Sequence, residues 1–374
     1  MISDWTVWLE WFLKALAVAL SLLVGFIFLT WYERRALARI QSRIGPNRAG
    51  PFGLLQPIAD AIKLVFKEEL TPAKADRILF FWAPVITMVP SIIMAAVIPW
   101  GTSFTLWNGR VVTLYLADIN VGVLYLMSIA SIAVYGIVLA GWSSNNKYAM
   151  LGGLRSSAQM LSYELALGLS FVVTIILANS MRILDIVNEQ RNVWFVVLQP
   201  VGAIIFWIAT LAEVNRAPFD MPEAEQELTA GYHSEYSGMK FALFFMAEYQ
   251  KMIIVCMMTA TLYFGGFLGP GVDRYPLLGP VYLLIKVVVL LFVMIWVRAT
   301  WPRIRYDRLM AFGWKILLPL SLAVAFITAT GIVLRDITGN PLYFWSIPVV
   351  STLAGLFTVV MVYRELRRLS YERA

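Results

Sequence analysis

The sequence predicts an all-α integral membrane protein with about nine transmembrane helices, one short amphipathic helix at the membrane surface, an external N-terminus and a cytoplasmic C-terminus. Three observations predict this fold class: an apolar composition, nine apolar stretches of spanning length and an uneven distribution of basic residues. Hydrophobic residues make up 60% of the 374 residues and charged residues 14%, whereas soluble domains carry roughly 45–50% and about 25%. So few charges cannot cover a soluble surface, and we therefore expect the chain to lie in lipid.

Nine apolar stretches each approach the length of about 20 residues that a helix needs to cross the hydrocarbon core. They run over residues 11–31, 78–99, 119–140, 158–179, 193–212, 241–264, 281–297, 316–334 and 342–362. No Gly/Ser linker, low-complexity run or convincing internal repeat separates them. The sequence therefore predicts a single polytopic membrane domain over residues 1–374.

Basic residues are concentrated in alternate connections between these stretches. Segments 32–77, 142–156, 213–240, 298–315 and 364–374 contain 22 Lys and Arg, and the other connections contain 5. Because cytoplasmic loops carry an excess of Lys and Arg, the first set is predicted to be cytoplasmic and to form the functional face. The net charge of +7 is then explained by topology and predicts no binding of nucleic acid.

Cysteine and histidine are nearly absent from the chain. Cys256 is the only cysteine and His233 the only histidine. A disulfide needs two cysteines, an iron–sulfur cluster about four thiolates and a haem with paired histidine ligands two histidines. The composition therefore predicts no metal and no redox cofactor in this chain, so any electron-transfer centre has to lie on another polypeptide.

The first inner loop is predicted to contain the amphipathic helix. Over residues 54–68 the apolar and polar side chains fall on different helix faces, with Leu54, Ile58, Ile62, Val65 and Phe66 on one and Gln56, Asp60, Lys63 and Lys67 on another. At 1.5 Å per residue this helix reaches only about 22 Å, too short to span. It is predicted to lie in the interface, either as a headgroup anchor or as the lip of a cavity that a lipid-soluble substrate enters sideways.

Acidic residues are concentrated in the third inner loop. Between residues 213 and 240 there are six acids against the two bases Arg216 and Lys240; the acids are Glu213, Asp220, Glu223, Glu225, Glu227 and Glu235. Asp220 and Glu223 fit a capping box at a helix start, but capping does not explain the others. Crowded carboxylates repel one another and take up protons more readily. The loop is predicted to be either a solvated acidic surface or a group that responds to a nearby change of charge.

Four ionisable residues lie inside the predicted spans: Glu164, Glu248, Lys251 and Lys286. Insertion scales assign about 2.5–3.5 kcal/mol to Asp, Lys or Arg at a helix centre. Glu164 and Glu248 are expected about 9 Å inside their spans, and Lys251 shares a helix face with Glu248. Intramembrane acids of this kind predict a proton path, with structural pairing between helices as the alternative.

Five motifs, in order, resemble the H-subunit family of bacterial NADH-quinone oxidoreductase, which corresponds to chain 1 of mitochondrial complex I. The first is Arg43-Ile-Gly-Pro-Asn47 with Gly53-Leu-Leu-Gln-Pro-Ile-Ala-Asp-Ala-Ile-Lys63. The others begin at Asn146, Glu213, Phe244 and Trp296 and read NKYAMLGGLR through SYE, EVNRAPFDMPEAEQELTAG, FFMAEY and WVRATWPRIRYD. The resemblance covers roughly residues 30–312. The ninth span, 342–362, and the Arg-rich tail exceed the commoner eight-span form.

The resemblance implies a membrane component of a proton-translocating NADH:quinone reductase, a translocase, with no redox centre and no catalytic residue of its own. It implies that the chain forms much of a quinone chamber, anchors the peripheral arm and couples quinone reduction to proton pumping. The family positions that line or support the chamber are Arg34, Asp60, Lys63, Arg216 and Arg298. The positions assigned to the acidic path are Glu164, Glu213, Glu223, Glu225, Glu227 and Glu248, to which we add Glu235 of the same loop.

The resemblance also implies partners and a location. Quinone is the substrate, whereas flavin and iron–sulfur clusters belong to partner subunits. The partners are the peripheral-arm subunits with the terminal iron–sulfur cluster, small membrane subunits, antiporter-like subunits and the lipid of the bacterial inner membrane. The isolated chain is expected to be inactive.

Two other functions fit parts of the same pattern. The first is that of the equivalent subunit of a membrane-bound hydrogenase or ferredoxin-linked complex, which has the acidic path without a need for quinone. The second is a stand-alone ion transporter. Transporter folds usually contain inverted repeats, and the sequence shows none.

Overall fold

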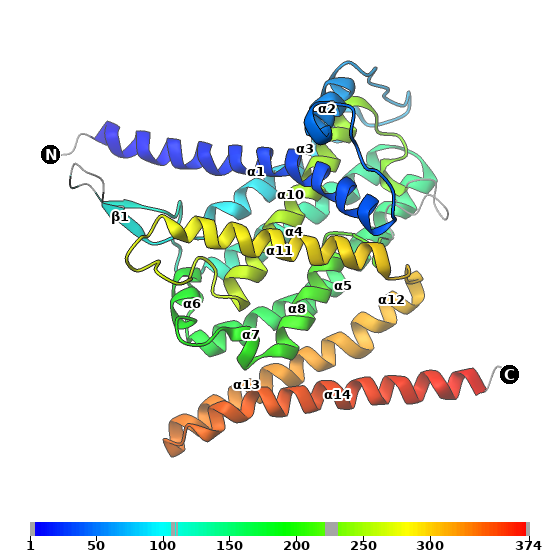
Figure 1. Ribbon diagram of the computed structural model, residues 1–374. Helices are drawn as coiled ribbons and strands as arrows, with labels where there is room; N and C mark the ends of the chain where they lie inside the picture. The colour runs from blue at the N-terminus through cyan, green and yellow to red at the C-terminus, as the bar shows by residue number, and fades with distance from the viewer. Residues whose placement is uncertain (1–3, 106–108, 110, 221–230, 372–374) are drawn as a thin grey trace.

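The computed structural model describes residues 4–105, 109, 111–220 and 231–371, and nearly all of its regular structure is helical (Figure 1). The long helices are α1 (Asp4–Ile40), α3 (Arg77–Met94), α4 (Gly122–Ser143), α5 (Lys147–Ala178), α10 (Gly238–Tyr263), α11 (Leu278–Thr300), α13 (Leu318–Thr338) and α14 (Leu342–Tyr371). The shorter α-helices are α2 (Gln56–Val65), α6 (Ile183–Glu189), α7 (Phe195–Leu198), α8 (Pro200–Glu213) and α12 (Tyr306–Phe312).

The remaining elements are short. They are the 3₁₀ turns η1 (Pro51–Gly53), η2 (Ala95–Val97) and η3 (Gly231–His233), the π-helical segment η4 (Gly313–Leu317), and the strands β1 (Ser103–Thr105) and β2 (Val111–Thr113). The two strands pair antiparallel, with Phe104 opposite Val112.

Eight helical segments among the described residues are long and apolar enough to cross a membrane, which confirms the predicted class of all-α membrane protein. The predicted span 193–212 differs from the others. It is divided at Gln199, because Pro200 lacks an amide hydrogen and begins a new helix, and α8 then has only 14 residues. Most of the side chains of α8 are nevertheless buried, so α8 lies inside the bundle.

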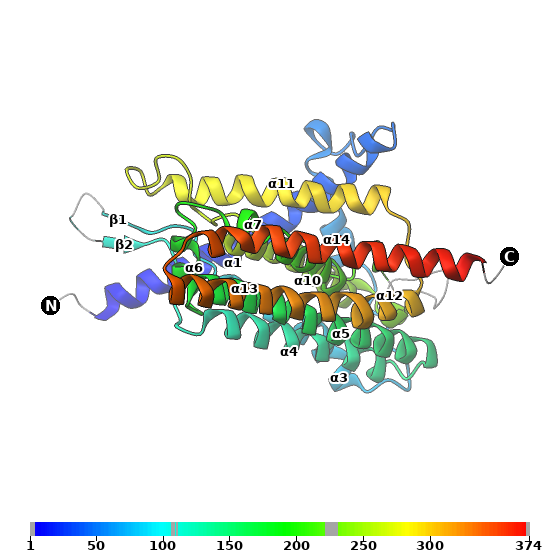
Figure 2. The same cartoon turned by 90° about the horizontal axis from the view of Figure 1, so that it is seen from below.

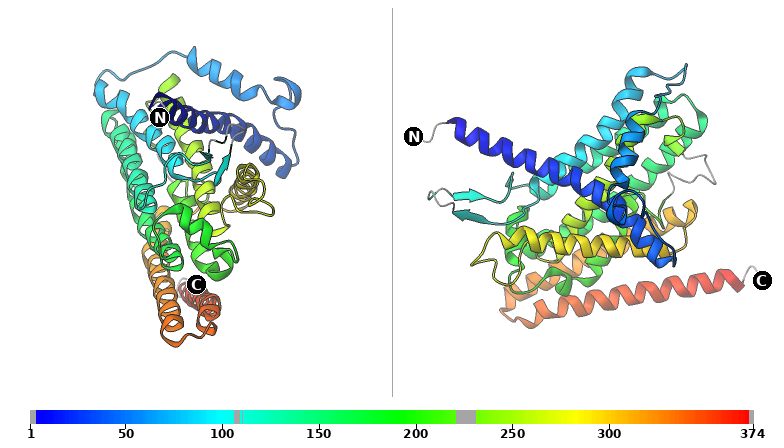
Figure 3. Two further views of the ribbon diagram at one scale, coloured as in Figure 1. Left: turned by 90° about the vertical axis from the view of Figure 1, so that its left-hand side faces the viewer. Right: turned by 45° about the horizontal axis from the view of Figure 1, so that its top comes forward.

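The two termini lie at opposite ends of the helix bundle, the N-terminus beside the β1–β2 hairpin and the C-terminus on the side of α12 (Figures 1 and 2). Seen along the helices, the bundle has an elongated cross-section, with α1 and α2 near one end and the α13–α14 hairpin at the other (left panel of Figure 3). Which end faces the cytoplasm stays a prediction from the distribution of basic residues.

Two inner connections are shorter than the sequence predicted. Helix α1 continues to Ile40, so its 37 residues reach about 55 Å, and the first inner loop begins later than residue 32. Helix α5 begins at Lys147, where the side chain of Asn146 accepts a hydrogen bond from the amide of Tyr148, so most of segment 142–156 is helical. Hydropathy detects only the apolar part of a helix, whereas charged residues such as Glu and Arg extend it without difficulty.

The amphipathic helix forms as predicted but is shorter, since α2 covers Gln56–Val65 instead of 54–68. Its Ile58 and Ile62 side chains are exposed, while the face that carries Asp60, Ala61 and Leu64 turns toward α1 and α10. The helix therefore lies across the inner ends of α1 and α10 (Figure 1).

A close contact between backbones holds the end of the acidic loop against α5. A Cβ atom on Gly152 would lie 2.6 Å from the Cα of Gly231, closer than any packing allows. Gly231 itself has φ of 56°, a left-handed conformation that glycine adopts without strain. Glycine at both positions therefore lets η3 pack directly on α5.

Candidate functional site

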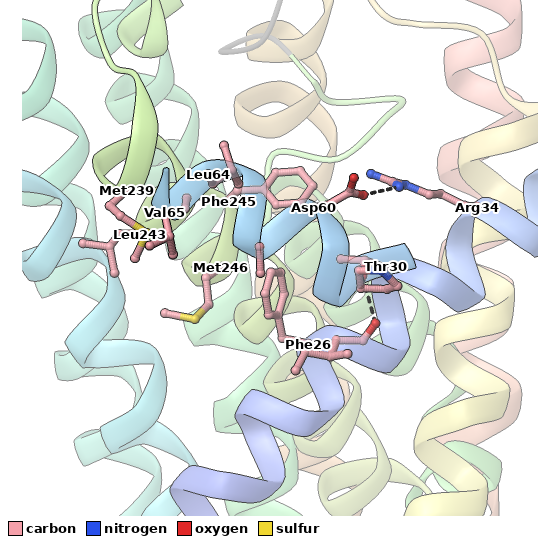
Figure 4. A pocket seen from close by; sticks show the side chains of 14 residues that line it. Phe26, Thr30, Arg34, Asp60, Leu64, Val65, Met239, Leu243, Phe245 and Met246 are labelled. Atoms are coloured by element: carbon pink, nitrogen blue, oxygen red, sulfur yellow. Dashed lines mark hydrogen bonds and ion pairs between the residues drawn. The ribbon is translucent and has the colours of Figure 1, made fainter. Parts of the chain in front are cut away.

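An apolar cavity of about 170 Å³ lies between α1, α2 and α10 (Figure 4). Phe26 and Thr30 of α1, Leu64 of α2, and Phe245 and Met246 of α10 are among the residues that line it. The cavity is small and nearly all of its wall is hydrocarbon. It therefore suits an extended apolar group.

One ion pair forms the polar end of this cavity. Arg34 Nη1 donates to Asp60 Oδ2 at 2.5 Å, and Gln56 Nε2 donates to Asp60 Oδ1 at 3.2 Å. Both charged side chains line the cavity and remain partly exposed, as Figure 4 shows. A molecule with an apolar tail and a polar head group matches this combination of wall and ion pair.

Glu33, next to Arg34 on α1, belongs to a buried network of charges. Its carboxylate accepts from Arg216 Nη1 at 3.2 Å and forms an ion pair with Arg298 at the end of α11. Arg216 Nε lies 2.6 Å from Glu248 Oε1 of α10. Two carboxylates and two guanidinium groups from three helices and the loop after α8 thus offset one another, as buried charges must.

Arg216 is held in this network from several sides. Its guanidinium lies 4.4 Å from the ring centre of Tyr249, whose hydroxyl also hydrogen-bonds Glu33. Burial alone would lower the pKa of Arg216, but Glu248 and Glu33 raise that pKa well above its usual range, so the guanidinium stays charged. Because Phe245 packs 4.6 Å from Tyr249, the cavity and the charged network adjoin along α10.

The chain reaches this position through a turn directly after α8. Asn215 has φ of 56°, a left-handed conformation that asparagine tolerates better than most residues. The side-chain amide of Gln159 on α5 donates to the carbonyls of Ala212 and Phe219, at 2.9 and 2.8 Å. These bonds fix both sides of the turn, so Arg216 points back into the bundle.

A second group of ionisable residues follows further inside the bundle. Lys251, three residues after Glu248, is buried and interacts electrostatically with Glu213, Glu248 and Glu164. Glu213 is also buried, and Glu164 forms a hydrogen bond with the hydroxyl of Ser131 on α4. The charged groups therefore continue from α1 through α10 and α8 to α5 and α4.

Comparison with known proteins agrees with this geometry. A family model described as NADH dehydrogenase matches residues 13–329. The chain belongs to this family. The H subunit of NADH-quinone oxidoreductase from Thermomicrobium roseum is 50% identical over 316 residues, which cover 82% of this chain and 91% of that protein.

Two further relatives bear the same name with the number 2. The H subunit of this number from Syntrophobacter fumaroxidans is 49% identical over 327 residues, which cover 87% of this chain and 97% of that protein. The one from Geobacter sulfurreducens is 52% identical over 301 residues, which cover 80% and 90%. The similarity therefore extends over nearly the whole length of these relatives.

Four of the five chamber positions that the family resemblance implied lie in the region just described. Arg34 and Asp60 line the cavity, and Arg216 and Arg298 share Glu33. Lys63 is different. It lies on the exposed side of α2 and is not among the residues that line the cavity.

The acidic positions divide into three sets. Glu164, Glu213 and Glu248 all interact with Lys251. Glu235 has another partner, since its carboxylate accepts from Asn146 Nδ2 at 2.6 Å and so ties the η3 loop to the start of α5. Glu223, Glu225 and Glu227, together with the helix start predicted at Asp220, lie in or next to segment 221–230, outside the described residues.

Three residues of the charged network were not predicted from the sequence. Glu33 was read as the start of an inner loop, although an acid followed by two arginines at the end of a span is itself a signal for buried pairing. Tyr249 and Ser131 carry no sequence signal, because their roles depend on contacts with Arg216 and Glu164 that only the fold creates. Among the residues described, no group of three or more His, Cys, Asp or Glu is placed to hold a metal ion.

Proposed function

We propose that this chain is the H subunit of a proton-translocating NADH-quinone oxidoreductase in the bacterial inner membrane, and that residues 1–374 act as one polytopic domain of that enzyme. One observation carries the proposal: two consecutive residues of α1 connect the cavity to the buried charges. Arg34 pairs with Asp60 at the cavity, and Glu33 pairs with Arg216 and Arg298. Relatives of about 50% identity that bear the name of this subunit support it.

The cavity between α1, α2 and α10 is the proposed access path for quinone. A quinone combines a long isoprenoid tail with a polar head, and it arrives from the bilayer. The apolar wall fits the tail, and Arg34 with Asp60 lies where the head group passes. In this proposal Arg216 and Arg298 support the chamber, and Lys63 faces the peripheral arm.

The buried charges are the proposed coupling element. Reduction of a quinone to a quinol takes up two electrons and two protons, so it changes the charge beside Glu33 and Arg216. Because Arg216 also pairs with Glu248, a shift of this guanidinium changes the field at Lys251, Glu213 and Glu164. Coupled carboxylates respond to such a change by taking up or releasing protons. Glu223, Glu225, Glu227 and Glu235 are proposed to belong to the inner part of the same path.

The redox chemistry is proposed to take place on partner subunits. Flavin and the iron–sulfur clusters belong to the peripheral arm, whose terminal cluster delivers electrons to the quinone head. Small membrane subunits and antiporter-like subunits are proposed to receive the charge signal. The isolated chain, in this proposal, oxidises no NADH.

The proposal is tested first on the intact complex. A tagged form of the chain should co-purify with flavin- and NADH-binding subunits, and the complex should reduce quinone at the expense of NADH. Co-purification with hydrogenase subunits, without activity toward NADH and quinone, would show the hydrogenase-type function instead. Proton flux through the purified chain alone would show a transporter.

The access path is tested with Arg34→Ala and Asp60→Ala. Both variants should reduce the rate of quinone-linked NADH oxidation at least tenfold, while NADH oxidation by ferricyanide, which takes electrons in the peripheral arm, is kept. Arg39→Ala is the matched control, since Arg39 is exposed on the same helix and does not line the cavity. Equal quinone reduction by Arg34→Ala and Arg39→Ala would contradict the proposed path.

A further inference from the structure

Lys251 is a buried cation that faces carboxylates from three helices. Its side chain is 7% exposed, and the groups that interact with its charge are Glu213 of α8, Glu248 of α10 and Glu164 of α5. No ion pair within 4.0 Å joins its ammonium group to a carboxylate of the described residues. The lysine therefore acts on the acids through the field of its charge and not through one fixed partner.

The charges around Lys251 do not balance when every group is ionised. Glu33 and Glu248 are matched by Arg216 and Arg298 through direct ion pairs. Among the described residues, Glu213 and Glu164 have no ion pair, and Lys251 is the one cation that interacts with both. Two carboxylates therefore face a single positive charge inside the bundle.

An uncompensated charge inside a bundle is costly, with an effective penalty of several kcal/mol per ion. The cheapest neutral arrangement of this group is one ionised carboxylate, one protonated carboxyl and the ammonium group. Two nearby carboxyl groups that share one proton titrate as a pair and not as separate sites.

We propose that Lys251 is a charge-compensating residue of the proton path, which makes Glu213 and Glu164 hold one transferable proton between them. This inference rests on the proposed function. The proton can move from an oxygen of one carboxyl to an oxygen of the other without any change in the net charge of the group. The N–H bonds of Lys251 stay intact during this movement, so Lys251 is a positioning residue for charge and is not itself a relay.

The same geometry defines what loss of the lysine does. Without the positive charge, the neutral arrangement has both carboxyls protonated, and neither is free to accept a proton. With an arginine in its place the charge remains. A residue that only fills space would behave in the opposite way, because methionine matches the length of lysine and arginine is larger.

The test uses the assembled complex in proteoliposomes, with Lys251→Met, Lys251→Gln and Lys251→Arg compared with wild type. Three quantities are measured: quinone-linked NADH oxidation, protons translocated per NADH, and the infrared carbonyl band of protonated carboxyl groups. Lys286→Met is the matched control for the loss of a lysine within a helix, since Lys286 binds only backbone carbonyls. Lys251→Gln keeps a polar side chain and replaces Lys251→Met if the latter assembles poorly.

We expect at least a tenfold loss of proton translocation in the neutral variants, retention within about threefold in Lys251→Arg, and one additional protonated carboxyl in the neutral variants. Normal translocation in a neutral variant would overturn the proposal. So would equal loss in Lys251→Arg, or an unchanged carboxyl band. If the wild-type complex itself fails to reduce quinone with NADH, the proposed function fails; if only the Lys251 variants behave normally, this inference fails alone.

Discussion

Two lysines inside the membrane region are surrounded in opposite ways. The Nζ atom of Lys286 on α11 donates to three backbone carbonyls, those of Phe264, Gly266 and Leu268, at 2.7–2.8 Å, and it lies 5.1 Å from the ring centre of Trp194. Lys251 on α10 faces three carboxylates and no such set of carbonyls among the described residues. Backbone carbonyls are fixed dipoles that cannot take up a proton, whereas carboxylates can.

The difference shows how to separate structure from function among intramembrane charges. A lysine whose donors are satisfied by backbone joins two segments, here α11 and the loop after α10. A lysine among acids controls how many of those acids are charged. Residue type is the same in the two cases, so the chemistry of the partners decides the role.

The largest effect is expected from Arg216→Ala, which tests the network at its centre. This change leaves Glu33 and Glu248 without their shared guanidinium, and removing one partner of a buried pair costs about 3–5 kcal/mol. We expect little assembled complex on native gels. Arg216→Lys should assemble better, since it keeps the charge, but reduce quinone slowly, because an ammonium group cannot bridge two carboxylates as a planar fork does. Normal assembly of Arg216→Ala would show that the network is not needed for folding.

The next largest effect is expected from Glu213→Gln, examined beside Glu164→Gln and Glu248→Gln. Glutamine keeps size and hydrogen bonding but cannot titrate, and a neutral amide is cheaper to bury than a carboxylate. A purely structural acid should therefore tolerate the change. We expect assembled complexes with at least tenfold less proton-gradient formation. Glu189→Gln, an exposed acid of α6, is the control, and near-normal coupling in all three test variants would exclude the proton path.

A smaller and different effect is expected from Lys286→Met. The change leaves three carbonyls without their donor, and hydrogen bonds to a charged group contribute about 1.5–3 kcal/mol each. The thermal stability and amount of the complex should fall. Protons translocated per NADH in the assembled fraction should stay at the wild-type value, because no titratable partner is lost. A drop in this ratio would erase the distinction between the two lysines.

The smallest effect is expected from Asp118→Asn at the end of the bundle beside the hairpin. Asp118 binds Arg182 through both oxygens, but the Arg182 side chain is 38% exposed. Ion pairs of this kind contribute about 1 kcal/mol or less, and salt screens them. Only a slight loss of thermal stability, shrinking at high salt, should be measurable. A strong loss of coupling would extend the functional network to this end of the protein.

Composition and hydropathy predicted the fold class and eight of the spanning helices. They did not predict the division at Gln199, although Pro200 was visible in the sequence, because an apolar run reads the same whether or not its helix is interrupted. They also placed one helix end too early, at Trp31, and one helix start too late, at Ala158. Polar residues such as Glu33 and Arg155 extend helices once the fold provides partners or solvent.

The candidate site was predicted where a residue is unusual in itself. Glu164, Glu213 and Glu248 were found because acids are rare in apolar helices. Glu33 was missed because its importance depends on Arg216 and Arg298, which are 183 and 265 residues away in the sequence. A pairing over such distances is a property of the packed bundle, and no local pattern encodes it.

The same separation along the chain has a consequence for biosynthesis. A ribosome adds about 5–20 residues per second, so Arg298 follows Glu33 by roughly 10–50 s. During this interval α1 leaves the ribosome with an acid that has no counter-ion, while the carbonyls that receive Lys286 are made before the lysine itself. The hairpin of α10 and α11 can therefore enter the membrane as a finished unit. The inner end of α1 has to wait near the lipid head groups, so the first helix to be synthesised is among the last to reach its final position.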